Sequence, residues 1–126
     1  MCGFLVEFRK KKIYFNRSKF NKAANLISHR GPDQSGELHL NDISMKFYRL
    51  SIRDVSKNGS QPMWDISNRY LIVFNGEIYN SESLKKKLKN INLKGTSDTE
   101  ILVNLYARYK KEILNLIDGM FSFLIY

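Results

Sequence analysis

The chain has 126 residues, 43% of them hydrophobic, with two prolines and seven glycines, which predicts one globular domain and excludes a disordered or fibrous chain. A single cysteine excludes an internal disulfide, and with only two histidines we expect no metal site. The net charge of +9 suggests nucleic-acid binding, but the basic clusters lack a recognition motif, so we expect a solvated surface and no nucleic-acid partner.

The first quarter of the chain predicts a strand and a helix. Residues 4–8 have the two-residue period of a strand, and residues 13–15 are expected to be its hairpin partner. This apolar run is too short for a signal peptide or a membrane span, so we expect a cytoplasmic protein without membrane contact. Apolar residues from 20 to 27 then follow helical spacing, with Asn16 or Ser18 as the cap and a Gly-Pro pair as the stop.

The middle of the chain predicts further strands around a long loop. Two strands, residues 36–40 and 43–52, are expected to meet at a turn. The polar stretch 53–68 is the longest predicted loop and is expected to form a lid over a site. A buried strand over 70–74 and a basic helix over 81–89 follow it.

The last third predicts one amphipathic helix and a final strand. Ser97 and Glu100 have the S-x-x-E spacing of a capping box, and the residues behind them provide one apolar face. Residues 120–126 are apolar and aromatic, which predicts a buried strand.

Cys2 directly follows the initiator methionine. Removal of Met1 would leave a thiol and a free α-amine on the same residue, and the reference pKa of an α-amine is about 7.7–8.0. Such an amine can accept the proton of the thiol and so activate it as a nucleophile. The alternative is an inert cysteine buried in a short strand.

Three further positions have both a structural and a functional interpretation. Asn75-Gly76 has the sequence of a type I′ hairpin turn, but an asparagine amide beside a glycine N–H also provides two donors for an oxyanion. Arg49 is either a surface strand residue or a bidentate ligand for a small carboxylate. Asp98 is either a first-turn carboxylate that complements the helix dipole or a partner for an ammonium group.

The order of the motifs is more specific than any one of them. In chain order they are Met1-Cys2-Gly3-Phe4, His29-Arg30-Gly31-Pro32-Asp33-Gln34-Ser35-Gly36, Arg49-Leu50-Ser51-Ile52, Gln61-Pro62-Met63, Phe74-Asn75-Gly76-Glu77-Ile78-Tyr79-Asn80, Ser97-Asp98-Thr99-Glu100 and Asp118-Gly119-Met120-Phe121-Ser122-Phe123. Over essentially its whole length, the chain resembles the glutaminase domain of glutamine-hydrolysing asparagine synthetases.

The resemblance implies a class II glutamine amidotransferase with the N-terminal-nucleophile hydrolase fold, an α+β fold in which two antiparallel β-sheets lie between helical layers. The strands and helices predicted above fit that layout. It implies that glutamine is hydrolysed to glutamate and ammonia through a thioester on one cysteine. The implied catalytic residues are Cys2, Asn75 and Gly76. The implied substrate-binding residues are Arg49, Leu50, Ile52, Glu77 and Asp98.

The resemblance also implies what these residues do not contain. The family's glutaminase domain continues past the final predicted strand, so residues 1–126 are expected to be its N-terminal part, with an incomplete fold and no synthetase domain. ATP and magnesium would belong to that synthetase domain, and we expect no cofactor for this chain. A synthetase domain acting in trans and a homodimer formed through unpaired sheet edges are the expected partners. The alternative function is an inactive remnant that serves as a binding or assembly module.

Overall fold

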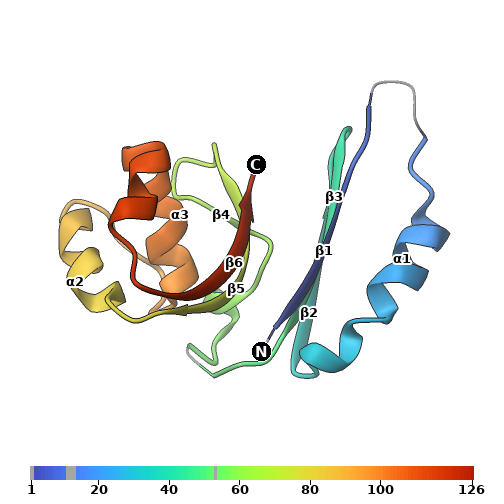
Figure 1. Ribbon diagram of the computed structural model, residues 1–126, viewed down its shortest axis with the longest axis horizontal. Helices are drawn as coiled ribbons and strands as arrows, with labels where there is room; N and C mark the ends of the chain where they lie inside the picture. Colours follow the sequence, from blue (N-terminus) through green and yellow to red (C-terminus); the bar gives the residue numbers. More distant parts are fainter. Residues whose placement is uncertain (1, 11–13, 53) are drawn as a thin grey trace.

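The computed structural model describes residues 2–10, 14–52 and 54–126. Within these residues the elements form four layers, with helix α1 outside one sheet and helices α2 and α3 outside the other (Figure 1). The first half contains β1 (Gly3–Phe8), α1 (Arg17–Asn25), β2 (Gln34–His39) and β3 (Ile43–Arg49). The second half contains β4 (Met63–Trp64), β5 (Leu71–Ile78), α2 (Ser81–Lys85), α3 (Asp98–Tyr109) and β6 (Gly119–Ile125). The predicted α+β fold with two antiparallel sheets between helices is confirmed.

The first sheet has the order β1-β3-β2, and both pairings are antiparallel. Strand β1 therefore pairs with β3, and the predicted hairpin with residues 13–15 is wrong for Tyr14 and Phe15, which lie in no strand. Residue 13 lies outside the described residues. The ring of Phe15 instead packs against Phe20 of α1 and His39 of β2, with centroid distances of 5.5 and 4.8 Å. Phe15 therefore packs where the chain enters α1, and the strand that pairs with β1 is β3.

The second sheet has the order β4-β5-β6. The prediction of a hairpin turn at Asn75-Gly76 is wrong, because β5 continues to Ile78 and both residues pair with β6. Gly76 has a φ of 154°, and a Cβ at this position would overlap the carbonyl of Met120 on β6. A glycine is therefore required here by close strand approach and not by a turn.

The core lies in two apolar layers on either side of the second sheet. Alternate residues of β3, namely Ile43, Met45 and Phe47, are fully buried against Leu71 and Val73 of β5. The other face of β5 packs on α2 and α3, and its cluster includes Ile72, Phe74, Leu84, Ile101, Leu102 and Leu105. Burial of each such side chain stabilises the fold by about 1.5–3 kcal/mol. The two sheets are thus held face to face, and their ends meet at the candidate site.

Several predicted boundaries move by a few residues. Helix α1 is capped by Asn16, whose side chain accepts a hydrogen bond from the Lys19 N–H at 3.0 Å, and it ends before the 3₁₀ turn Ser28–Arg30. The predicted basic helix over 81–89 is a short α2 followed by the 3₁₀ turn Lys86–Leu88. Strand β3 ends at Arg49, three residues before its predicted end. No helix in the described part of the chain is long and apolar enough to cross a membrane.

Candidate active site

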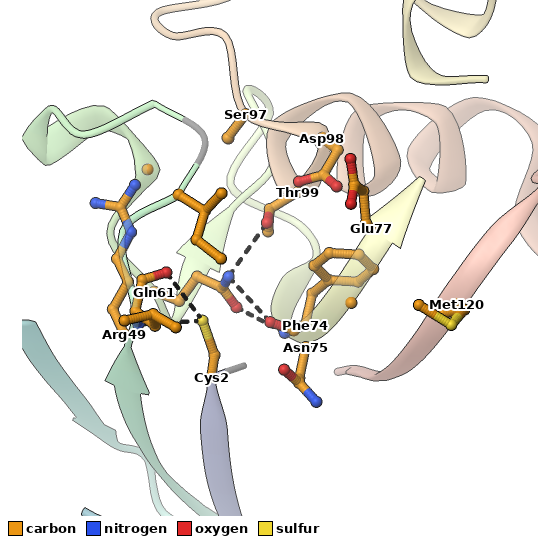
Figure 2. A pocket seen from close by; sticks show the side chains of 14 residues that line it. Cys2, Arg49, Gln61, Phe74, Asn75, Glu77, Ser97, Asp98, Thr99 and Met120 are labelled. Atoms are coloured by element: carbon orange, nitrogen blue, oxygen red, sulfur yellow. Dashed lines mark hydrogen bonds between the residues drawn. The ribbon is translucent and has the colours of Figure 1, made fainter. Parts of the chain in front are cut away.

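A cavity of about 170 Å³ opens where the ends of β1, β3 and β5 approach the start of α3 (Figure 2). The structure brings together every candidate site residue that the sequence indicated. The lining residues are Cys2, Arg49, Leu50, Ile52, Gly59, Gln61, Phe74, Asn75, Gly76, Glu77, Ser97, Asp98, Thr99 and Met120. They come from both sheets, from the loop after β3 and from the first turn of α3. The predicted lid, residues 53–68, contributes Gly59 and Gln61 to one wall.

Cys2 lies one residue before β1, at the end of the first sheet, and is half-buried. Its sulfur accepts a hydrogen bond from the backbone N–H of Leu50 at 3.4 Å and lies 3.6 Å from the Leu50 carbonyl. The Arg30 Nε donates to the carbonyl of Cys2 at 3.0 Å. Hydrogen bonds therefore hold both the sulfur and the carbonyl of Cys2, and the side chain lines the cavity (Figure 2).

Arg49 is the last residue of β3, and it is only 5% exposed. Its Nη1 donates to the Gln34 Oε1 and to the Ser56 carbonyl, each at 2.8 Å, and its Nη2 donates to the Asp54 carbonyl. A Cβ at Gly59 would overlap the guanidinium. The loop after β3 thus wraps around the guanidinium and fixes its plane, which sequence reasoning did not foresee.

The side chain of Asp54 ties this loop to the start of α3. Its Oδ2 accepts the N–H of Thr96 at 2.7 Å, and its Oδ1 accepts the N–H of Ser56 at 3.2 Å. Burial raises the pKa of the Asp54 carboxyl, but the hydrogen bonds from Ser56 and Thr96 outweigh it and hold the pKa below its ordinary value. The carboxylate form, which makes these contacts, is therefore the stable one at neutral pH.

Asn75 and Gly76 lie side by side in β5, opposite Ser122 and Phe121 of β6. Asn75 is half-buried and Gly76 is exposed. Both line the same cavity as the sulfur of Cys2. A side-chain amide and a backbone amide at adjacent positions are the donor types that stabilise a tetrahedral oxyanion.

Two carboxylates lie on the side of the cavity away from Arg49 (Figure 2). Asp98 is the first residue of α3 and is 7% exposed, and its Oδ2 accepts the N–H of Ile78 at 3.1 Å. The N-terminus of the helix favours an anion at this position. Glu77 precedes Ile78 on β5 and is exposed. The cavity therefore has a cation on one side and anions on the other.

Gln61 and Thr99 also line the cavity, and the sequence assigned neither of them a role. The Gln61 side chain is buried and bonded to the backbone of Phe74 and to the Thr99 hydroxyl. The Gln61-Pro62-Met63 motif was the one sequence signal that could have indicated this residue. Among the described residues no three His, Cys, Asp or Glu side chains are grouped so that they could hold a metal ion.

Comparison with known proteins identifies the family. A family model described as a glutamine amidotransferase domain matches residues 1–126. The chain belongs to the glutamine amidotransferase domain family. Over 131 aligned residues it is 41% identical to asparagine synthetase [glutamine-hydrolyzing] 1 of Bacillus subtilis (strain 168). The alignment covers 100% of this chain and 21% of that protein.

Two plant proteins with related names are similar to this amidotransferase domain as well. Asparagine synthetase [glutamine-hydrolyzing] of Zea mays is 38% identical over 127 residues, and asparagine synthetase [glutamine-hydrolyzing] 1 of Arabidopsis thaliana is 33% identical over 126. Each alignment covers 99% of this chain and 21% of the plant protein. The chain thus spans about a fifth of the length of the curated relatives that it matches.

Proposed function

We propose that this amidotransferase domain hydrolyses L-glutamine to glutamate and ammonia through a γ-glutamyl thioester on Cys2. The observation that carries the proposal is the single cavity shared by Cys2, the donors at Asn75 and Gly76, and the opposed charges of Arg49 and Asp98. The family match supports glutamine as the substrate. The names of the relatives support hydrolysis of glutamine as the reaction.

The charges of the cavity complement those of free glutamine. This amino acid has an α-carboxylate, an α-ammonium group and a neutral side-chain amide. In the proposed complex the guanidinium of Arg49 binds the carboxylate, and Asp98 with Glu77 binds the ammonium group. Leu50 and Ile52, which follow Arg49 in the chain and line the cavity, contact the aliphatic part of the substrate in this complex. The amide then lies next to the sulfur of Cys2.

The first half of the proposed reaction forms the thioester. Once Met1 has been removed, the α-amine of Cys2 accepts the thiol proton, and the sulfur attacks the amide carbon of glutamine. The carbonyl oxygen becomes an oxyanion, which the Asn75 side chain and the Gly76 N–H stabilise. The carbon–nitrogen bond then breaks, and the α-ammonium of Cys2 returns its proton to the leaving nitrogen, which departs as ammonia.

The second half releases glutamate. Water attacks the thioester carbon while the α-amine of Cys2 accepts a proton from it. The same two donors stabilise the second oxyanion. The carbon–sulfur bond breaks, the proton returns to the sulfur, and glutamate leaves. The balance is one glutamine and one water consumed for each glutamate and ammonia produced.

The names of the relatives support a destination for the ammonia. They are glutamine-hydrolysing asparagine synthetases, and each is about five times as long as the part that this chain matches. We therefore propose that residues 1–126 are the N-terminal part of an amidotransferase domain that delivers ammonia to an ATP-dependent synthetase domain. ATP and magnesium would act on that domain, whereas the steps above use only residues of this chain.

The proposal is tested by measuring glutamate and ammonia released from glutamine by the purified protein, alongside the Cys2→Ala variant. We expect equal amounts of the two products from the wild type and none above background from Cys2→Ala. Glutamine binding without product, measured by calorimetry on protein that has lost Met1, would contradict hydrolysis and favour the binding-module alternative. Absence of both binding and turnover in that protein would overturn the proposal altogether.

A further inference from the structure

Gln61 connects three layers of the fold at the edge of the cavity. The residue is only 6% exposed. The Oε1 accepts the N–H of Phe74 at 2.6 Å, and the Nε2 donates to the Phe74 carbonyl at 3.2 Å and to the Thr99 Oγ1 at 3.1 Å. A Cβ at Gly36 of β2 would overlap the Gln61 carbonyl, so the backbone of Gln61 lies directly against the first sheet. One residue thus contacts β2, β5 and α3.

The side chain of Gln61 continues the pairing of β4 with β5. Strand β4 pairs Met63 with Ile72 in an antiparallel register, and one further step of that register sets Pro62 opposite Val73. Strand β4 spans only Met63–Trp64, so the backbone pairing does not reach that position. The next step sets Gln61 opposite Phe74, and its carboxamide both donates to and accepts from the Phe74 backbone, as a hydrogen-bonded pair of strand residues does.

The two residues that Gln61 holds are each adjacent in sequence to a site residue. Phe74 precedes Asn75, and Thr99 follows Asp98. The second N–H of the carboxamide spans from the strand to the helix, so it fixes β5 and the first turn of α3 relative to each other. Figure 2 shows these hydrogen bonds as dashed lines between Gln61, Phe74 and Thr99.

We propose that Gln61 is a positioning residue that sets the separation between the oxyanion donor Asn75 and the ammonium ligand Asp98, an inference that rests on the proposed glutaminase function. Glutamine has a fixed number of methylene groups between its α-carbon and its amide. A cavity anchored at both ends therefore aligns the amide with Cys2 only when β5 and α3 keep their spacing. Misplacement by about 1 Å is enough to cost about a hundredfold in rate.

The test compares Gln61→Met with Asn104→Leu. Methionine matches the shape of glutamine without its hydrogen bonds. Asn104 is also a buried amide that joins a loop to α3, because it accepts the N–H of Ile66 at 3.0 Å and donates to the Glu100 carbonyl at 2.8 Å, but it does not line the cavity with Cys2. Both variants lose buried hydrogen bonds to backbone, so both are expected to melt at a lower temperature.

Turnover separates the two variants, measured below both melting temperatures on protein that has lost Met1. We expect Gln61→Met to lower kcat for glutamine about ten- to a hundredfold, and Asn104→Leu to leave it within about twofold, as expected for a site without shared partners. The rate at which iodoacetamide alkylates Cys2 should stay the same in both, because the thiol itself is unchanged. Equal kcat in the two variants would overturn the proposal and leave Gln61 a purely structural residue.

Substitutions of Thr99 provide a second route if Gln61→Met does not fold. Thr99→Val removes the hydroxyl that accepts the Gln61 Nε2 but keeps the pairing with Phe74. We expect a smaller loss of kcat than in Gln61→Met, and recovery in Thr99→Ser, which keeps the hydroxyl. An unchanged kcat in Thr99→Val would contradict the link between β5 and α3. If the wild type itself neither turns over glutamine nor binds it, the proposed function fails before this inference is reached.

Discussion

The backbone N–H of Leu50 donates to the sulfur of Cys2 at 3.4 Å. Leu50 directly follows Arg49, whose guanidinium is held by the next loop. The same short segment therefore fixes the proposed nucleophile and the proposed carboxylate ligand relative to each other. The two groups come from opposite ends of the first half of the chain, and the antiparallel pairing of β1 with β3 brings them together.

Asn75→Ala should lower kcat for glutamine hydrolysis by about 10²–10³, because it removes one of two oxyanion donors. The KM should change much less, since the side-chain amide acts on charge that develops in the transition state. Steady-state kinetics check this, with Asn115→Ala as a control at an exposed asparagine outside the cavity. Full turnover in Asn75→Ala would rule out the oxyanion role.

Arg49→Lys should raise the KM for glutamine about ten- to a hundredfold, because a lysine keeps the charge but loses the planar guanidinium that Gln34 and the loop after β3 hold in place. The kcat at saturating glutamine should fall much less. The same substitution at Arg17, an exposed residue that pairs with Glu37 outside the cavity, serves as the control. A normal KM in Arg49→Lys would remove this residue from the binding site.

Gly59→Ala should also raise the KM, although Gly59 has no side chain to contact the substrate. A Cβ there would overlap the Arg49 guanidinium and come within 3.0 Å of the Asp54 carbonyl, so the guanidinium has to move. Because both changes act through one group, the double variant with Arg49→Lys should be little worse than Arg49→Lys alone. Additive increases in KM would show that Gly59 acts by another route.

Asp65 gives a prediction for the pH dependence of stability. Its buried carboxylate accepts hydrogen bonds from the Ser67 side chain and from the N–H groups of Arg69 and Tyr70, both at 2.7 Å. Burial raises the pKa of the Asp65 carboxyl, but these hydrogen bonds outweigh it and hold the pKa below the ordinary value. The folded pKa is thus lower than the unfolded pKa of about 3.9.

The stabilisation by Asp65 is therefore present at neutral pH and is lost as the pH falls through the folded pKa. Asp65→Asn should lower the free energy of unfolding by about 1–3 kcal/mol at neutral pH, because an amide cannot accept all of these bonds. The difference between the variant and the wild type should begin to narrow below about pH 4, the unfolded pKa, and should vanish once the pH is below the folded pKa. Urea unfolding across this range measures it, and a difference that is independent of pH would contradict the assignment.

Sequence patterns predicted those elements that depend on local contacts. The S-x-x-E spacing correctly located the start of α3, where the Ser97 side chain accepts the Glu100 N–H at 3.3 Å. The capping box is only half formed, because the Glu100 carboxylate accepts the N–H groups of Lys94 and Gly95 instead of returning to Ser97. The choice between these donors depends on the path of the preceding loop, which helical spacing does not encode.

Pairings between distant strands were the main failure. Residues 75–76 look like a turn because asparagine and glycine adopt positive φ angles readily, but β6, more than forty residues later, extends the strand through them. The hairpin predicted after β1 failed for a similar reason, since β3 offered a longer apolar partner. Local propensity gives way to tertiary contacts at such sites.

The order of motifs indicated the candidate site residues, and the roles of these residues stay predictions. Every residue that the resemblance indicated lines one cavity. The residues that hold those side chains in place, such as Gln34, Asp54 and Gln61, were missed. Their contacts are hydrogen bonds to residues of other segments, and no residue pattern within one segment indicates them.

The most direct test of the account is intact mass spectrometry of the protein before and after treatment with a diazo-ketone analogue of glutamine. We expect loss of Met1 and one covalent label per chain on Cys2. Excess glutamine should slow the labelling, whereas its enantiomer D-glutamine should not. Protein that lacks Met1 but leaves Cys2 unlabelled, or is labelled equally fast with and without glutamine, would contradict the claim that this cavity is a glutaminase site.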